Sequence, residues 1–253
     1  MRTDENLFFV TVDMGINLVE KIQDAYPDRY LNVGIAEQNA IGICAGLSNL
    51  GYRPFVYTIS NFLIHRCFEQ IRNEIAIHRY PVTLLGSSAG YDNPPLGPTH
   101  HILDDWGALR TIPGFSIYSP SSVCYSKALI DKVLAQNNPA YIRIPKGSFE
   151  NPDSDEDYVY REAPSPQILL ITYGSLGQTG LKLQARQSNL SLLICNRLFP
   201  IDERRVSDIL ARYEKVLVLE DHFPSSGMYN LLCEFCMTRR IFVQMFSCAP
   251  RGQ

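Results

Sequence analysis

Short apolar runs alternate with longer, helix-like stretches along this chain, and no other feature limits the possible folds as strongly. The strand-like runs occupy residues 7–13, 53–60, 81–87, 115–120 and 140–145. Helix-like stretches lie among them, at 36–50, 62–79, 101–111 and 121–136. Strands that alternate with helices of this length form βαβ units, whose strands run parallel. This part of the chain therefore predicts a mostly parallel sheet flanked by helices.

A polar stretch then interrupts the pattern, which restarts after it. Residues 148–166, "SFENPDSDEDYVYREAPSP", are acidic and rich in Pro, Ser and Asp, which predicts an interdomain linker. Apolar runs return at 168–175, 190–196, 215–221 and 240–246, again separated by helix-like stretches. We therefore expect two α/β domains, at residues 1–147 and 167–253, each with a mostly parallel sheet flanked by helices.

Composition argues against several classes of partner. Of the 253 residues, 45% are hydrophobic and 19% are charged, and the formal net charge is −3. This balance gives no positive field for a nucleic acid or an anionic membrane, so we expect neither as a partner. No apolar run approaches the roughly 20 residues that span a bilayer, and the first residues lack the pattern of a signal peptide.

Cysteine usage is typical of a reduced, cytoplasmic protein. The 7 cysteines are scattered and odd in number, unlike a disulfide framework. Cys233 and Cys236 form one C-x-x-C pair in an apolar stretch, and no second pair follows it. We therefore interpret this pair as helix packing rather than as a zinc site.

Unusual polar residues gather where the predicted strands end. Asp13 ends the first run, Ser60 and Asn61 follow the second, and a long loop at 86–101 follows the third. In open parallel sheets, ligands bind beyond the carboxyl ends of the strands. The loop "GSSAGYDNPPLGPTHH" holds glycines, prolines and paired histidines, and loops of this length are more often functional or disordered than neutral.

Glu37 stands at the entrance of an apolar helix. The stretch "NVGIAEQNAIGICAGLSNLG", residues 32–51, is mostly small and apolar from Ala36 onward, which is typical of a buried helix. A carboxylate is rarely buried without a partner. Taken alone, Glu37 is best interpreted as a helix N-terminal acid stabilised by the helix dipole.

Several motifs together resemble one enzyme family. The segments "DRYLNVGIAEQNAIGICAGLSNLGYRPFV", "FEQIRNEIA", "GPTHH", "IPGFSIYSPSS" and "PAYIRIPKG" resemble the pyrimidine-binding half of transketolase-type enzymes. 1-Deoxyxylulose-5-phosphate synthases share this pattern. The later segments "LLITYGS", "LLICNRLFPIDE" and "VLVLEDH" are similar to the small C-terminal domain of the same family. The resemblance covers nearly the whole chain.

The resemblance gives Glu37 a catalytic and cofactor-binding task. In thiamine diphosphate enzymes, a carboxyl group hydrogen-bonds N1′ of the aminopyrimidine and favours the imino tautomer, whose 4′-imine removes the thiazolium C2 proton. A carboxyl in an apolar setting keeps its proton more easily, which suits this exchange. Phe62 matches the aromatic residue that packs on the pyrimidine ring. Arg66 and Asp13 are further candidates for cofactor binding, with a subunit contact as an equal alternative for Arg66.

The resemblance also implies substrate-binding residues. His100 matches the histidine of the family's G-x-T-H motif, which approaches the reacting oxygens of the substrate and can transfer protons near neutral pH. Arg143, in "YIRIPKG", matches an arginine that holds the substrate phosphate, and a salt bridge at a strand end is the alternative.

Departures from the family pattern point to an unusual substrate. Ser88, a candidate substrate-binding residue, stands where a phosphate- or sugar-binding His or Arg is expected, and Leu96 stands where an Asp would contact a sugar hydroxyl. His101 replaces the usual glutamine. Because a cationic anchor and a hydroxyl acceptor are missing, we expect ketol transfer between modified, deoxy or nucleotide-linked sugars rather than ordinary ketose phosphates.

The family's diphosphate-binding half is absent from this sequence. That half is marked by a G-D-G motif followed by Asn, and the 253 residues contain no G-D-G. The resemblance therefore implies one subunit of a split transketolase-like enzyme of carbohydrate metabolism. A separate subunit would bind Mg²⁺ and the diphosphate of thiamine diphosphate, most simply in an α₂β₂ heterotetramer.

Other functions stay open. A decarboxylating ligase similar to deoxyxylulose-phosphate synthase, or the β subunit of a 2-oxoacid dehydrogenase, would use the same domains. The T-H-H loop, the "NVGIAEQN" run and the length favour the transketolase side over the dehydrogenase. A non-catalytic homologue that only binds a partner is the remaining alternative, against which the presence of Glu37, Phe62 and His100 argues.

Overall fold

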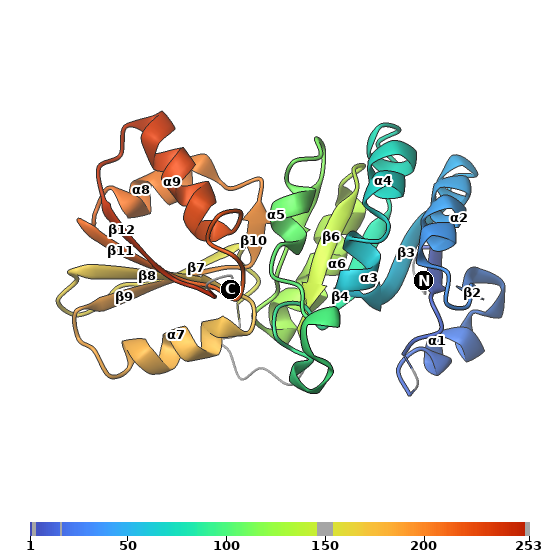
Figure 1. Ribbon diagram of the computed structural model, residues 1–253, viewed down its shortest axis with the longest axis horizontal. Helices are drawn as coiled ribbons and strands as arrows, with labels where there is room; N and C mark the ends of the chain where they lie inside the picture. The colour runs from blue at the N-terminus through green and yellow to red at the C-terminus, as the bar shows by residue number, and fades with distance from the viewer. Residues whose placement is uncertain (2–3, 16, 146–153, 251–253) are drawn as a thin grey trace.

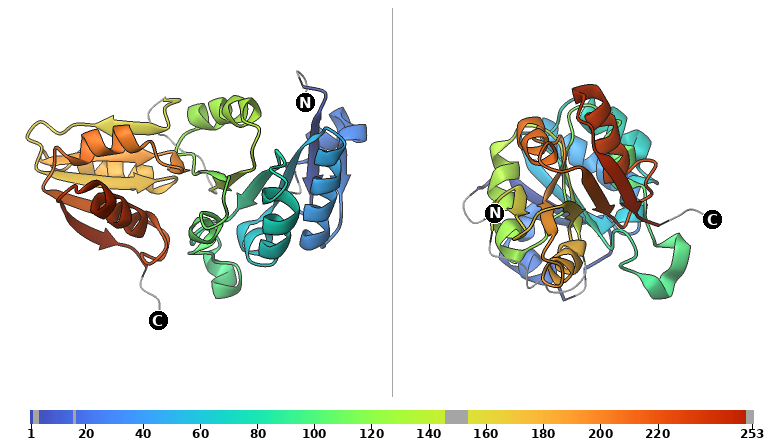
Figure 2. Two further views of the ribbon diagram at one scale, coloured as in Figure 1. Left: turned by 90° about the horizontal axis from the view of Figure 1, so that it is seen from above. Right: turned by 90° about the vertical axis from the view of Figure 1, so that its left-hand side faces the viewer.

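The computed structural model of the chain describes residues 1, 4–15, 17–145 and 154–250. Its strands form two sheets that follow one another along the long axis of the molecule, the second sheet on the left of Figure 1. Both sheets are mostly parallel and are flanked by helices (Figure 2). The predicted α/β class with two such sheets is therefore confirmed.

The described residues give the first sheet seven strands, in the order β10-β5-β6-β4-β3-β1-β2. All its pairs are parallel except β10 with β5. The strands are β1 (Leu7–Thr11), β2 (Tyr30–Asn32), β3 (Arg53–Ile59), β4 (Thr83–Ser87), β5 (Ser116–Tyr118), β6 (Ala140–Ile144) and β10 (Arg197–Phe199). The helical elements are α1 (Glu20–Ala25), η1 (Pro27–Arg29), α2 (Glu37–Asn49), α3 (Ser60–Ile64), α4 (Phe68–Gln70), η2 (Ile71–Ala76), η3 (Pro94–Thr99), α5 (Asp105–Leu109) and α6 (Val123–Ala135).

The second sheet has five strands among the described residues, in the order β12-β11-β8-β9-β7. Only β7 runs antiparallel to its neighbour there. The strands are β7 (Tyr158–Arg161), β8 (Ile168–Tyr173), β9 (Leu190–Cys195), β11 (Lys215–Leu219) and β12 (Gln244–Cys248). The helices are α7 (Leu176–Gln184), α8 (Glu203–Leu210) and α9 (Met228–Arg239). Buried apolar side chains of both sheets, such as Leu84 and Val218, belong to one cluster, so the sheets share a continuous core.

The helix expected at 36–50 is α2. Ala40, Ile41 and Cys44 are fully buried at the spacing of one helical face, which packs against β3. The helix ends before Gly51, whose φ of 91° is a conformation that glycine adopts without strain. The burial of this face places the start of α2, with Glu37, at the carboxyl ends of the neighbouring strands.

The continuous helix expected at 62–79 is broken in the structure. The chain forms α3, then α4, and continues as the π-type helix η2. The thiol of Cys67 donates to the carbonyl of Phe62 at 3.6 Å, at the point where α3 has ended. Side-chain bonds to the backbone of this kind compete with the regular helical ladder. The break matters because Arg66 lies within it.

The segment interpreted as a linker, 148–166, contains a strand. Residues 148–153 lie outside the described residues, but Tyr158–Arg161 form β7, which pairs antiparallel with β9. The linker interpretation is therefore wrong for these four residues, because Tyr158 is only 2% exposed and the segment completes the edge of the second sheet. In addition, β10 belongs to the second half of the chain but pairs with β5 of the first sheet. The proposed boundaries at 147 and 167 therefore do not separate the two sheets completely.

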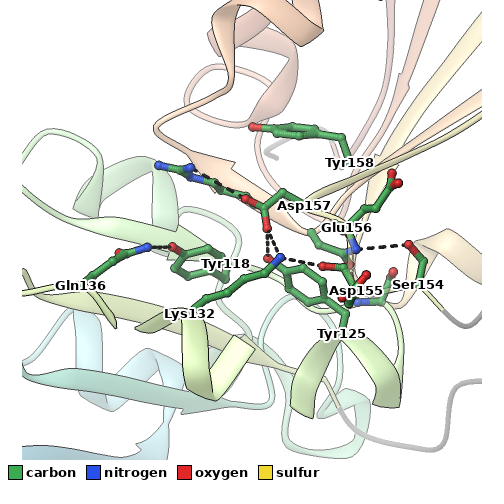
Figure 3. Close-up of polar contacts among 12 residues, drawn as sticks. Tyr118, Tyr125, Lys132, Gln136, Ser154, Asp155, Glu156, Asp157 and Tyr158 are labelled. Atoms are coloured by element: carbon green, nitrogen blue, oxygen red, sulfur yellow. Dashed lines mark hydrogen bonds and ion pairs between the residues drawn. The ribbon is translucent and has the colours of Figure 1, made fainter. Parts of the chain in front are cut away.

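The end of the acidic segment is attached to both parts of the molecule (Figure 3). The carboxylate of Asp157 accepts a hydrogen bond from the hydroxyl of Tyr125 at 2.9 Å and pairs with Lys132 at 2.7 Å, both on α6. Lys132 also donates to the backbone carbonyl of Asp155 at 2.6 Å. On its other side, Asp157 lies 3.8 Å from Arg197 of β10. Asp157 therefore joins α6 to the strand that returns from the second half.

The C-x-x-C pair lies on α9. Cys236 is buried, and the thiol of Cys233 contacts the sulfur of Met245 at 3.6 Å. Within the described parts of the chain, no three His, Cys, Asp or Glu side chains come together as a metal site. In the same residues, no helix has both the length and the apolar character needed to cross a membrane.

Candidate active site

Glu37 is buried at the amino end of α2, and its partner comes from the break after α3. Only 4% of Glu37 is exposed. Its Oε2 atom lies 2.6 Å from Nη1 of Arg66, whose side chain is 45% exposed. The backbone carbonyl of Arg66 accepts a hydrogen bond from the side chain of Gln38 at 3.0 Å, which fixes the break against α2. A buried carboxylate therefore faces a half-exposed cation.

Phe62 and His100 complete this group. The guanidinium carbon of Arg66 lies 4.5 Å from the centre of the Phe62 ring, a cation–π contact. The imidazole of His100 meets the same ring edge to face, with 5.1 Å between the ring centres. Four residues predicted from the sequence thus form one chain of contacts, from α2 through α3 to the loop after β4.

A residue without a predicted role positions His100. The side-chain amide of Asn61 donates to the backbone carbonyl of Thr99 at 2.6 Å and so ties the loop to α3. The hydroxyl of Thr99 lies 3.0 Å from Nδ1 of His100. Nε2 of His100 has no hydrogen-bond partner among the described residues, which leaves it free to exchange a proton with a bound molecule. The only sequence signal for Asn61 was its place directly after a strand.

Asp13 lies at the carboxyl end of β1, beside the turn that leads to Glu37. The side-chain oxygen of Asn32 accepts hydrogen bonds from the backbone N–H of Asp13 at 3.0 Å and of Gly34 at 2.9 Å. Asp13 has a φ of 44° and its side chain is exposed. No hydrogen bond or ion pair among the described residues joins it to Glu37. Its proposed contact with the cofactor stays a prediction.

Ser88 is placed away from solvent. It has a φ of 59°, it is 1% exposed, and its hydroxyl has no partner among the described residues. Leu96, on η3 of the same loop, is 53% exposed. The substrate contact predicted for Ser88 needs an accessible hydroxyl, so this prediction gains no support from the burial.

Arg143 lies in a different environment from the Glu37 group. It is 2% exposed, and its Nε donates to Asp105 at 2.8 Å while its Nη1 donates to Asp221 at 3.0 Å. Asp105 begins α5, and Asp221 follows β11 in the second domain. The hydroxyl of Tyr141 also donates to Asp105, at 2.7 Å. The alternative of a salt bridge at a strand end therefore describes the observed contacts of Arg143.

The space beside Arg143 is small. It is lined by side chains of both domains and has a volume of about 10 Å³, room for about one water molecule. The Nη2 atom of Arg143 has no hydrogen-bond partner among the described residues. A phosphate does not fit this space, so phosphate binding by Arg143 stays a prediction that requires movement of its neighbours.

Burial sets the charges around Arg143. Burial lowers the pKa of His222, so its imidazole is neutral near pH 7. Its Nε2 accepts a hydrogen bond from the backbone N–H of Gly107 at 3.3 Å, and its Nδ1 lies 3.1 Å from the carbonyl oxygen of Phe223. A neutral imidazole that carries its proton on Nδ1 makes both hydrogen bonds. Burial, and then the charge of Asp105, raise the pKa of Tyr141 well above its usual range. Sequence reasoning gave Asp105, Asp221 and His222 no role.

Comparison with known proteins identifies similar sequences. Residues 1–151 match the family model of the transketolase pyrimidine binding domain. One subunit of the apulose-4-phosphate transketolase of Phocaeicola vulgatus is 26% identical over 244 residues, which cover 92% of this chain and 78% of that subunit. The 1-deoxy-D-xylulose-5-phosphate synthase of Prochlorococcus marinus is 30% identical over 244 residues, which cover 92% of this chain and 37% of the synthase. The chain thus spans only about a third of the length of such synthases.

Solved structures share both sheets. The structure described as "Split gene transketolase, inactive beta4 tetramer" superposes with a TM-score of 0.86 at 22% identity, over 99% of this chain and 85% of that one. Transketolase from Campylobacter jejuni superposes with a TM-score of 0.79 at 14% identity, over 99% of this chain and 40% of that one. At these identities the likeness establishes the fold.

Proposed function

The chain belongs to the family defined by the transketolase pyrimidine-binding domain, and we propose that it supplies the pyrimidine half of a split thiamine diphosphate-dependent enzyme. The enzyme transfers a two-carbon ketol unit between sugars. The observation that carries this proposal is the contact group of Glu37, Arg66 and Phe62. It combines a buried carboxylate with an aromatic face beside it.

The contact group fits the aminopyrimidine ring of the cofactor. The guanidinium of Arg66 is planar, donates N–H to Glu37 and lies over the ring of Phe62. An aminopyrimidine is also planar and carries a ring nitrogen at its edge. Once Arg66 turns toward solvent, Glu37 would hold N1′ and Phe62 would pack on the ring.

Each side chain then has a defined task. Bound thiamine diphosphate supplies the thiazolium carbon that reacts with the substrate's carbonyl carbon. Glu37 holds the proton that it shares with the pyrimidine nitrogen, and its burial keeps water from competing for that hydrogen bond. His100 presents Nε2 to the substrate oxygens and acts there as the proton donor or acceptor.

A separate subunit completes the proposed site. The match to one subunit of a transketolase, over 78% of the length of that subunit, supports a split enzyme, and the 253 residues contain no Gly-Asp-Gly motif. We assign Mg²⁺ and the diphosphate to the separate subunit, in a cytoplasmic α₂β₂ assembly with this chain. Exposed Leu18, Ile35 and Leu50 near the ends of α1 and α2 supply apolar surface for such a contact.

The substrate of the proposed reaction differs from common ketose phosphates. Ser88 is buried and uncharged where the family expects a cationic side chain, and the exposed Leu96 offers no hydroxyl acceptor. A modified, deoxy or nucleotide-linked sugar suits these residues better. A decarboxylating ligase is the second candidate, because the chain is 30% identical to a 1-deoxy-D-xylulose-5-phosphate synthase.

The test reconstitutes the enzyme with the product of a neighbouring gene that encodes the Gly-Asp-Gly domain. Thiamine diphosphate binding and turnover are then measured for the wild-type complex and for Glu37→Gln. We expect the variant to lose at least about 100-fold in turnover, because proton exchange with the pyrimidine nitrogen is lost. The free energy of unfolding should change by no more than about 1 kcal/mol, because glutamine keeps an acceptor, no charge is left buried, and water can solvate the half-exposed Arg66.

Glu203→Gln is the matched control. Glu203 also lies in the first turn of a helix and pairs with an arginine, Arg239, but it belongs to α8 in the second domain. It should leave turnover unchanged. A Glu37→Gln complex that turned over as fast as the wild type would refute the role of Glu37.

A further inference from the structure

We propose that the second domain positions the loop that carries His100. The His100 loop comprises residues 91–101, and the segment that holds it is 221–223, which begins two residues after the end of β11. The catalytic consequence rests on the proposed function, in which His100 serves the substrate. The contact between the two segments does not depend on that function.

The His100 loop is closed at its base. Gly90 and Ile102 exchange backbone hydrogen bonds of 3.0 and 3.2 Å, which join the two ends of the loop. Inside the loop, the backbone N–H groups of His100 and His101 both donate to the carbonyl of Gly97, at 3.0 and 3.2 Å. The loop is therefore a closed unit, whose orientation is set by what holds its base and its tip.

The second domain contacts the base of the loop at two points. A Cβ atom on Gly90, whose φ is 62°, would collide with Oδ2 of Asp221, so this carboxylate packs directly against the backbone there. The backbone N–H of Phe223 donates to the carbonyl of Leu103 at 2.7 Å, one residue beyond Ile102. The tip, by contrast, is tied to the first domain through Asn61 and Thr99.

The 221–223 segment is itself rigidly held. Asp221 forms an ion pair with Arg143, which in turn forms an ion pair with Asp105. Both Arg143 and Asp105 are almost completely buried. His222 accepts the backbone N–H of Gly107, so the segment is also attached to α5. Buried, paired groups of this kind hold one geometry, because leaving any of them unpaired is costly. Asp221 is therefore a positioning residue, and Arg143 acts through it.

The test begins with hydrogen exchange in the full chain. In Asp221→Ala, amides of residues 91–101 should exchange about tenfold faster than in the wild type, because the base of the loop has lost its support. Asp221→Asn keeps the shape and one acceptor for Arg143, and it should restore protection. Glu162→Ala is the matched control, because it removes a carboxylate that pairs with Arg212 on the surface of the second domain.

Kinetics of the reconstituted complex separate positioning from general damage. Asp221→Ala should lower kcat by about 10- to 100-fold, since a misplacement of about 1 Å costs that much. The affinity for thiamine diphosphate should stay unchanged, because Glu37 and Phe62 are not on the loop. In a His100→Ala background, Asp221→Ala should have little further effect on kcat.

Two results would overturn the proposal. One is that the amides of residues 91–101 exchange at the wild-type rate in Asp221→Ala. The other is that Asp221→Ala lowers kcat as much in the His100→Ala background as it does in the wild type. If Asp221→Ala does not fold, Gly90→Ala tests the same contact from the loop side, with loop exchange as its readout. A wild-type complex without turnover would refute the proposed function, while the exchange measurement would still decide whether the second domain holds the loop.

Discussion

Arg66 and Arg143 were both predicted from the sequence as site residues, and the structure places them in opposite environments. Arg66 is 45% exposed and has one carboxylate partner, Glu37. Arg143 is 3% exposed in its side chain and lies between two carboxylates, of which Asp105 is fully buried. One arginine sits at an accessible surface, and the other joins two domains.

The difference lies in what each ion pair can do. When the Glu37–Arg66 pair opens, water solvates the half-exposed guanidinium, whereas the buried Glu37 needs a new partner. The members of this pair can exchange partners, as binding of a cofactor beside Glu37 would require. A buried network cannot open without leaving a charge unpaired in the interior. The Glu37–Arg66 pair is therefore suited to binding, and the buried network around Arg143 is suited to holding geometry.

The largest expected effect comes from breaking the buried network. Arg143→Met should lower the free energy of unfolding by about 3–5 kcal/mol, because Asp105 and Asp221 lose their cation while they stay buried or half-buried. Unfolding in urea, followed by circular dichroism, measures this loss.

Arg212→Met provides the comparison for that experiment. Arg212 pairs with Glu162 at 3.0 Å, but both side chains are about half exposed. Its loss should cost no more than about 1 kcal/mol. Equal effects of the two variants would mean that Arg143 does not hold the domains together, and the contrast between exposed and buried arginines would fail.

The same contrast explains what could be predicted from the sequence. Periodic apolar runs gave the sheets and α2, because burial of one face fixes those elements locally. The break after α3 depends on Cys67 and Gln38, which act through single hydrogen bonds that no periodicity reveals. One of the two carboxylate partners of Arg143, Asp221, is 78 residues away in the second domain. A family motif identified Arg143 as notable, but its contacts come from tertiary structure.

A smaller effect is expected at the Glu37–Arg66 pair. In the reconstituted complex, Arg66→Met should raise the affinity for thiamine diphosphate about two- to fivefold, because Glu37 and Phe62 no longer have to release the guanidinium first. Titration of the cofactor against the complex measures this change. Arg72→Met is the control, because the side chain of Arg72, on η2, makes only one hydrogen bond within the described part of the chain, to Asn73. A loss of affinity in Arg66→Met would instead assign Arg66 a direct contact with the cofactor or substrate.

The smallest expected effect concerns an ion pair in which both side chains are half exposed and which joins the end of α3 to the start of α5. His65 lies 2.9 Å from Asp104, and the two side chains are 45% and 44% exposed. The hydrogen bond from His65 lowers the pKa of Asp104, and the same bond raises the pKa of His65 against the opposing effect of burial. Because the pKa of His65 is raised in the folded state, the ion pair contributes its full stabilisation at pH values below the ordinary histidine pKa of about 6.5. This contribution is lost as the pH rises through the pKa of the folded state.

His65→Ala should therefore lower stability by at most about 1 kcal/mol near pH 5.5, and by less near pH 8.5, where the wild-type imidazole is neutral. Urea midpoints at the two pH values measure the difference, and high salt should reduce it because the pair is exposed to solvent. His78→Ala is the control, since His78 stacks on Tyr80 and forms no ion pair among the described residues. A pH-independent effect of His65→Ala would mean that His65 stabilises α3 by packing. The charges of His65 and Asp104 would then contribute nothing to stability, in contrast to those of Glu37 and Arg66.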